Sequence, residues 1–252
     1  MTTIERATAK EAHAPSAGRV VLVTGGAGGL GAAIAEVLAE VGMRMVIGDL
    51  DPDRARGTAD AVVEAGGAAI AVPLDVCDAA GAHAAVAGAE ARYGRLDVLV
   101  NNAGTDLTLP FDEIPADAFD RVLDVNLGGP VIMTRAALPA LRRSRGHVVN
   151  IASTASFRGW PNASAYHASK WGLRGLGQGL FTELREYGVR LTTVFAGGMR
   201  TPFILDRFPD TPLDVLQDPR TVALAIRAVL DLPADSVVPE ITVLPMKETS
   251  WP

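Results

Sequence analysis

The chain has 252 residues, of which 48% are hydrophobic and 21% are charged, so it can build a sizeable globular core. Its formal net charge of −6 argues against a surface that binds nucleic acid or an anionic membrane. No apolar run has the length of a membrane span, the first residues lack the apolar stretch of a secretory signal, and the single cysteine excludes an internal disulfide, so we expect a cytoplasmic protein.

Apolar runs of strand type alternate along the chain with segments of helical length. We interpret residues 1–17 as a mobile leader and residues 18–252 as a single domain. Strands are expected at residues 20–24, 44–48, 69–74, 96–101, 146–152, 189–195 and 241–244. Helices are expected at residues 29–41, 52–65, 79–93, 115–143, 164–187 and 219–230. This alternation predicts an α/β fold, a doubly wound parallel sheet of about seven strands with helices on both faces.

A glycine-rich turn follows the first strand, in the sequence Thr24-Gly25-Gly26-Ala27-Gly28-Gly29-Leu30-Gly31. Such a turn lets the backbone approach a pyrophosphate, and the helix that begins near Gly29 offers free N–H groups and the positive end of its dipole. An ordinary tight turn is the alternative. We predict dinucleotide contacts at Gly25, Gly28, Gly29, Leu30 and Gly31.

Asp49 closes the second strand. A carboxylate there accepts hydrogen bonds from the adenosine ribose hydroxyls and repels a 2′-phosphate. No Arg or Lys occurs in the glycine turn, nor directly after Asp49 until Arg54. The pattern favours NAD over NADP, with Asp49 and Leu50 beside the ribose, and leaves Asp51 to cap the helix that begins at Pro52.

Tyr166 and Lys170 stand in the sequence Tyr-His-Ala-Ser-Lys, and Ser153 follows the fifth strand. Oxidation of an alcohol by hydride transfer needs a base for the hydroxyl proton, and carbonyl reduction needs the same group as an acid. Lys170 lies one helical turn after Tyr166, so we expect its ammonium to favour the phenolate. With the positive nicotinamide of the oxidised cofactor beside it, the phenol pKa would be lowered by about two to three units. Ser153 can hold the substrate oxygen beside Tyr166. The four histidines have no metal-ligand spacing, so we expect no metal site.

The glycine turn, Ser153, Tyr166 and Lys170, in this order, resemble the short-chain dehydrogenase/reductase family in its short single-domain form. The resemblance runs from about residue 18 to about residue 243. It implies a Rossmann-like fold and an NAD-dependent oxidoreductase that acts on a secondary alcohol or its ketone. It also implies that Asn126 holds a proton-relay water. An equal alternative is that Asn126 bonds to the backbone at a helix kink. The further cofactor contacts that it implies are Asp75, Val76, Asn102, Ala103, Gly104, Tyr166, Lys170, Gly197, Met199 and Thr201.

Two stretches depart from the family's pattern. Ala196 stands where the family usually has Pro, which adds backbone freedom but removes no reacting group. The end of the chain, residues 241–252, lacks the Gly-Gly strand that packs between subunits in many members. We therefore expect a homodimer through the helices at residues 115–143 and 164–187, with a homotetramer as the alternative.

The segment 202–219 is rich in Pro and Asp and is interpreted as a loop with a short helix that could close over a substrate. Asp106, Ser156, Phe157 and Trp160 are expected to roof the same pocket. Two other hypotheses compete with the dehydrogenase. The first is a non-catalytic nucleotide-binding sensor or scaffold, but its folding would not require Asn126, Ser153, Tyr166 and Lys170 together. The second is an epimerase or dehydratase with recycled NAD, but such enzymes usually carry an extra substrate domain.

Overall fold

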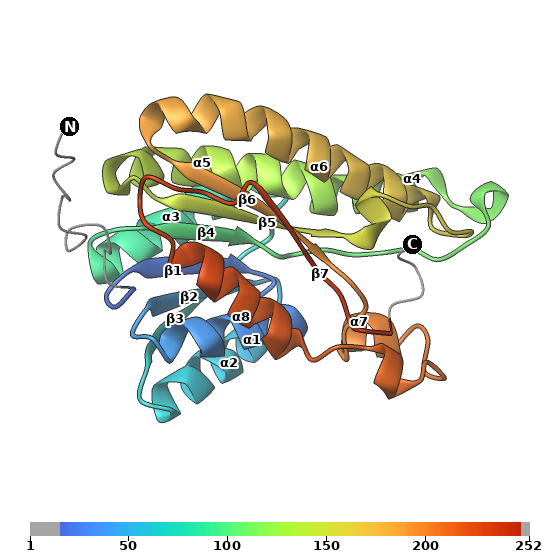
Figure 1. Cartoon of the computed structure of the whole chain (residues 1–252), viewed down its shortest axis with the longest axis horizontal. Helices are drawn as coiled ribbons and strands as arrows, with labels where there is room; N and C mark the ends of the chain where they lie inside the picture. The colour runs from blue at the N-terminus through green and yellow to red at the C-terminus, as the bar shows by residue number, and fades with distance from the viewer. Residues whose placement is uncertain (1–15, 248–252) are drawn as a thin grey trace, which may run out of the picture.

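The computed structural model describes residues 16–247, so most of the predicted leader lies outside the described residues. Seven parallel strands form one sheet in the order β3-β2-β1-β4-β5-β6-β7 (Figure 1). The strands are β1 (Val20–Thr24), β2 (Arg44–Asp49), β3 (Ala68–Pro73), β4 (Val98–Asn101), β5 (His147–Ser153), β6 (Arg190–Ala196) and β7 (Glu240–Val243). The predicted parallel sheet is confirmed, and every predicted strand agrees with an observed one to within two residues.

Helices cover both faces of the sheet (Figure 1). One face carries α1 (Gly29–Ala39), α2 (Pro52–Glu64) and α8 (Pro219–Leu230). The other carries α3 (Ala79–Tyr93), α5 (Gly129–Ser144) and α6 (Ser164–Leu184), and α4 (Ala116–Leu123) packs against α6. None of the helices within residues 16–247 is both long and apolar enough to span a membrane.

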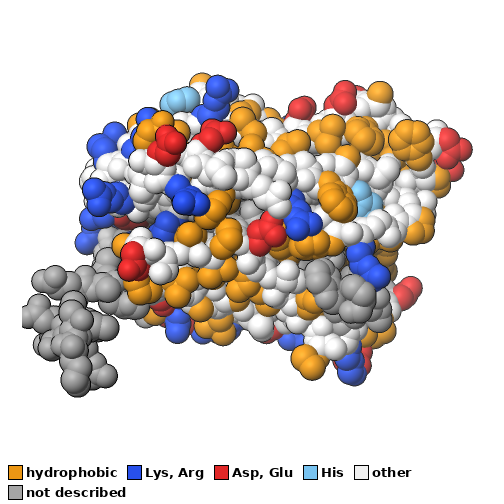
Figure 2. All heavy atoms as spheres, turned by 45° about the horizontal axis from the view of Figure 1, so that its top comes forward, with side chains coloured by type: hydrophobic (Ala, Val, Ile, Leu, Met, Phe, Trp, Pro, Cys, Tyr) orange, Lys and Arg blue, Asp and Glu red, His pale blue; other side chains and the backbone are white. Residues whose placement is uncertain are grey.

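The helix predicted at residues 115–143 is two helices joined by a π-helical turn, Asp124–Gly128. The segment 202–219 contains the short helix α7 (Pro202–Leu205) and a 3₁₀ turn, Leu213–Val215. Figure 2 turns the α6 side of the molecule toward the viewer, and on this face hydrophobic side chains lie between acidic and basic ones.

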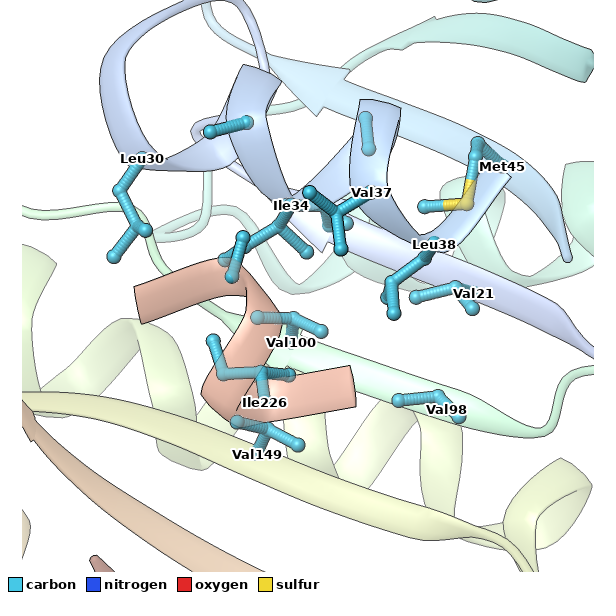
Figure 3. Close-up of a cluster of buried hydrophobic side chains, with 14 of the residues drawn as sticks. Val21, Leu30, Ile34, Val37, Leu38, Met45, Val98, Val100, Val149 and Ile226 are labelled. Carbon is cyan, nitrogen blue, oxygen red and sulfur yellow. The ribbon is translucent and has the colours of Figure 1, made fainter. Parts of the chain in front are cut away.

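Branched aliphatic side chains fill the core between the sheet and helices α1 and α8 (Figure 3). Fully buried members are Val21, Val98 and Val100 from the strands, Ile34 and Leu38 from α1, and Ile226 from α8. Full burial of such a side chain stabilises the fold by about 1.5–3 kcal/mol. This packing makes the sheet a rigid platform for the residues at the carboxyl ends of its strands.

The strand order reverses between β1 and β4, which are neighbours in the sheet although β2 and β3 intervene in the chain. The helix that follows β1 packs on the face with α8, whereas the chain after β4 leads to α5 on the other face. In doubly wound sheets, ligands bind at the carboxyl ends of the strands at such a point.

Candidate active site

One cavity of about 980 Å³ lies at the carboxyl ends of β1, β2, β3, β4, β5 and β6. All the predicted cofactor and catalytic residues line it except Gly31 and Asn126. Those that line it are Gly25, Gly28, Gly29, Leu30, Asp49, Leu50, Asp75, Val76, Asn102, Ala103, Gly104, Ser153, Tyr166, Lys170, Gly197, Met199 and Thr201. The structure thus brings residues from both halves of the sequence to one space.

The glycine turn is held by close contacts within the protein. Gly25 has φ +62°, and a Cβ there would lie 2.8 Å from the Cα of Ala103. A Cβ at Gly31 would lie 2.2 Å from the carbonyl oxygen of Gly25, so Gly31 shapes the turn without lining the cavity. The N-cap of α1, Gly28, offers no side-chain oxygen to the first N–H groups of the helix. Those N–H groups and the helix dipole suit a phosphate.

Thr24 and Asn102 tie the ends of β1 and β4 together. The Thr24 hydroxyl accepts from the backbone N–H groups of Asn102 and Ala103, both at 3.0 Å. The Asn102 amide donates to the carbonyl oxygens of Thr24 and Gly25, at 3.0 and 2.9 Å. Asn102 therefore has a structural role, and it and Ala103 line the cavity as well.

Asp49 is half-buried at the end of β2. One carboxylate oxygen accepts from the N–H of Ala27 at 3.0 Å, and the other from that of Asp51 at 3.1 Å. Each oxygen keeps acceptor capacity for a ribose hydroxyl. The predicted cap is confirmed, because the Asp51 side chain accepts from the N–H groups of Asp53 and Arg54 at the start of α2.

Arg54 lines the cavity, although it does not follow Asp49 directly in the sequence. A Cβ built on Gly28 would lie 3.0 Å from Nη2 of Arg54, so the guanidinium reaches back over the glycine turn. Side chains on a helix point toward its N-terminus, and Arg54 is in the first turn of α2. A positive charge therefore stands near the glycine turn, in the cavity that Asp49 also lines.

The residue after β3 and the stretch after β6, both predicted as cofactor contacts, also lie at the cavity. Asp75 follows β3, and its carboxylate accepts from the N–H of Cys77 at 2.9 Å. Thr201 is buried, and its methyl group lies 3.5 Å from the position of a Cβ on Gly29. The segment after β6 thus lies over the glycine turn, at the middle of the cavity.

Tyr166 lies in α6 and is buried. Burial raises the pKa of Tyr166 to about 12, and the hydrogen bond with Ser153 opposes this rise. Ser153 closes β5, and its hydroxyl also accepts from the N–H of Ala155 at 3.2 Å. The two hydroxyl groups are therefore side by side where β5 meets α6.

Lys170 is buried one turn further along α6. Its ammonium donates to the carbonyl oxygen of Ile151 at 2.9 Å and lies 5.6 Å from the centroid of the Tyr166 ring. Burial lowers the pKa of Lys170 to about 8. Among the protein groups, burial has the largest effect on the phenol and raises its pKa, so the predicted lowering by the ammonium together with the oxidised nicotinamide stays a prediction.

Asn126 lies in the π turn and is buried beneath the cavity. Its side chain accepts from the N–H of Thr105 and donates to the Thr105 carbonyl oxygen, both at 2.8 Å. It also donates to the Ser169 hydroxyl at 3.0 Å, which in turn donates to the carbonyl oxygen of Tyr166. This geometry fits a residue that fixes the kink and joins the loop after β4 to α6.

The expected roof is only partly correct. Asp106 and Trp160 line the cavity, together with Phe203 and Arg207 from the segment 202–219. Ser156 does not: it is buried and donates to the carbonyl oxygen of Lys170 at 2.8 Å. Phe157 packs edge-on against Phe195 of β6, with ring centroids 4.4 Å apart. Among the residues the structure describes, no cluster of His, Cys, Asp or Glu has the arrangement of a metal site.

The family model described as short chain dehydrogenase matches residues 19–211 of this chain. Trans-4-hydroxycyclohexanecarboxylate dehydrogenase of Sinomonas cyclohexanicum is 38% identical over 190 residues, 73% of each chain. The 2,5-dichloro-2,5-cyclohexadiene-1,4-diol dehydrogenase of Sphingobium indicum is 36% identical over 216 residues, 82% of this chain and 86% of that one. The NAD(+) 2-dehydro-3-deoxy-L-rhamnonate dehydrogenase of a Sphingomonas strain is 38% identical over 203 residues, 80% of each.

A solved structure has the same fold. A metagenomic short-chain oxidoreductase in complex with NADP superposes with a TM-score of 0.81 at 32% identity, over 92% of this chain and 99% of the other. The relatives and this structure therefore include both forms of the nicotinamide cofactor.

Proposed function

Because the chain belongs to the short-chain dehydrogenase family, we propose that it is an NAD-dependent oxidoreductase acting on a secondary alcohol or its ketone. The observation that carries the proposal is the hydrogen bond between half-buried Ser153 and buried Tyr166, at the same cavity as the glycine turn. The uncapped start of α1 and the carboxylate of Asp49 fit the pyrophosphate and the ribose of the nucleotide.

The reaction divides between the cofactor and the protein. When bound, the nicotinamide takes up or delivers the hydride, and its oxidised form adds a positive charge near the phenol. Tyr166 takes the hydroxyl proton of the alcohol in oxidation and returns it in reduction. Ser153 holds the substrate oxygen at the phenol, and Lys170, fixed by Ile151, supplies a buried positive charge beside the Tyr166 ring.

The relatives narrow the substrate class for testing. By their names, two of them act on six-membered carbon rings that carry a hydroxyl group and a second polar substituent. The cavity is large enough for such a ring beside the nucleotide, and Trp160, Phe203 and Leu216 give it apolar walls. We propose ring alcohols of this kind as the substrate class.

The direct test is a fluorescence titration with NADH and NADPH, followed by nicotinamide absorbance assays with ring alcohols and ketones. Binding of NADH with turnover of any ring alcohol supports the proposal. Binding without turnover on a broad panel favours the sensor hypothesis, and absence of binding of both cofactors contradicts the nucleotide site.

The choice of NAD depends on Asp49. We expect Asp49→Ser combined with Leu50→Arg to shift the ratio of the NADPH and NADH dissociation constants toward NADPH by about ten- to a hundredfold, since a carboxylate is replaced by a donor for the 2′-phosphate. Leu50 is 67% exposed, so an arginine has room there. The matched control is Asp51→Ser, which keeps the carboxylate of Asp49. An unchanged ratio in the double variant would mean that another residue, with Arg54 first in line, reads the ribose.

The oligomer that we propose is a homodimer through α5 and α6. A groove of about 380 Å³ lies between these helices, with Leu138, Leu176 and Leu180 beside the charged Arg135 and Glu183. We expect sedimentation equilibrium to give twice the monomer mass of 26.3 kDa, and Leu180→Glu to shift the protein toward monomer with NADH binding retained. A wild-type monomer or tetramer would contradict this. The cytoplasmic location and the absence of a nucleic-acid partner stay predictions from composition and charge.

A further inference from the structure

Asp106 is a buried carboxylate whose bonding the fold does not complete. It follows β4 in the loop above the cavity, and its side chain is 11% exposed. Its Oδ1 is buried and has no hydrogen-bond partner among the described residues. Its Oδ2 lies 3.8 Å from Nη1 of Arg207, which is an ion pair but longer than a hydrogen bond.

Burying this carboxylate is costly for the fold. Burial raises the pKa of Asp106, and the charge of Arg207, the backbone N–H of Leu107 and the charges of His167 and Lys170 oppose the rise. The Asp106 charge in turn raises the pKa of Tyr166, which makes the phenol a weaker acid and disfavours the phenolate. A buried polar atom without a partner costs about 1–3 kcal/mol. The Asp106 charge also favours the charged form of Lys170, but this leaves Oδ1 without a hydrogen-bond partner, and a donor on a ligand would supply one.

Arg207 decides which kind of ligand group fits. Its guanidinium donates to the carbonyl oxygens of Asp106 and Phe203, both at 3.0 Å, and lies 4.5 Å from the centroid of the Phe203 ring. It therefore holds one positive charge beside the one negative charge of the carboxylate. A ligand ammonium would meet a nearly neutral pair with a cation already in place, whereas a neutral hydroxyl can donate to the carboxylate without repulsion.

Apolar rings line the cavity together with the Asp106 carboxylate. The Phe203 ring lies 6.1 Å from the Tyr166 ring, tilted by 44°, and both rings border the cavity. A ligand that bonds to both Tyr166 and Asp106 needs two polar groups, and these rings favour an apolar body between them.

We propose that Asp106 is a specificity-determining residue that accepts a hydrogen bond from a second hydroxyl group of the substrate, on a carbon remote from the one that Tyr166 serves. The proposal rests on the proposed function, because it assumes that the alcohol is oxidised at Tyr166. It makes diols, rather than simple alcohols or amino alcohols, the substrates of this cavity.

The test compares three probes on the NADH-saturated protein by calorimetry: cyclohexanol, trans-cyclohexane-1,4-diol and trans-4-aminocyclohexanol. We expect the wild type to bind the diol most tightly. Asp106→Leu keeps the branched shape but removes the acceptor, so it should reduce the advantage of the diol over cyclohexanol by about tenfold or more. Asp106→Asn keeps one acceptor oxygen and should give an intermediate loss. Asp112→Leu, on an exposed 3₁₀ turn of the same loop, is the matched control and should leave the ratio unchanged.

Affinity for NADH and the melting temperature report whether each variant is folded, and kcat/KM is measured for every probe that is turned over. If the diol advantage depends on Asp106 but no probe reacts, the binding of a second hydroxyl group by Asp106 stands and the proposed function fails. If the probes react and the ratio is the same in the wild type and in both Asp106 variants, the proposed function stands and the inference is overturned. Tighter binding of the amino alcohol than of the diol, or no binding of any probe, also overturns it.

Discussion

Replacing Tyr166 by Phe is expected to lower kcat by about a thousandfold or more, while the dissociation constant for NADH changes by less than about twofold. General acid–base catalysis by a placed side chain contributes about 10²–10⁴ in rate, and in α6 this hydroxyl is the one bonded to Ser153. The phenyl ring keeps its packing against Phe203, so the cavity retains its shape. The measurement is single-turnover kinetics with the best ring alcohol, beside an NADH fluorescence titration.

Tyr187→Phe is the matched control, because Tyr187 is 44% exposed at the far end of α6 and does not line the cavity. It should leave both quantities unchanged. If Tyr166→Phe kept more than about a tenth of the wild-type rate, Tyr166 would not be the acid–base group. Equal loss of NADH affinity and rate would mean instead that the phenol mainly supports the nucleotide site.

The strands and the glycine turn could be predicted because their signals are local. Runs such as Val20–Thr24 are buried on both faces, and such strands read as continuous branched apolar residues. Gly25 and Gly31 were expected to let a pyrophosphate approach, and the structure adds a reason within the protein. A side chain at either position would overlap Ala103 or the turn itself.

The details of the site depend on contacts that are distant in sequence. The break at Asp124–Gly128 is stabilised by the Asn126 amide, whose partner Thr105 belongs to the loop after β4. Phe157 follows Ser153 closely in the chain, yet its ring turns toward Phe195 of β6 instead of the cavity. The pKa of Tyr166 depends on burial, which the spacing of Tyr166 and Lys170 cannot reveal.

Replacing Lys170 by Met is expected to abolish turnover and also to make the folded state more stable at neutral pH. Burial lowers the pKa of Lys170 from 10.5 to about 8 in the folded protein. Below pH 8 the lysine is charged in both states, and the folded state carries the full cost of burying that charge. This cost amounts to about 3 kcal/mol, and Lys170→Met removes it. The same substitution also removes the hydrogen bond to Ile151, which stabilises the folded state by about 1 kcal/mol. We therefore expect Lys170→Met to raise the unfolding free energy by about 2 kcal/mol at pH 7.

The sign of the pH dependence tests the cause. Between pH 8 and 10.5 the unfolded chain binds a proton at Lys170 that the folded chain has released, so wild-type stability should rise with pH over this window. Above pH 10 the raised pKa of Tyr166 acts in the opposite direction, because the folded phenol keeps a proton that the unfolded one loses. Urea unfolding between pH 7 and pH 10 should show that the gain in unfolding free energy of Lys170→Met over the wild type shrinks as pH rises. The control is Lys247→Met, at a side chain that is 63% exposed, and it should show no such trend. A constant advantage across this range would contradict the release of a proton by Lys170, and a less stable Lys170→Met variant at pH 7 would mean that the bond to Ile151 outweighs the cost of the buried charge.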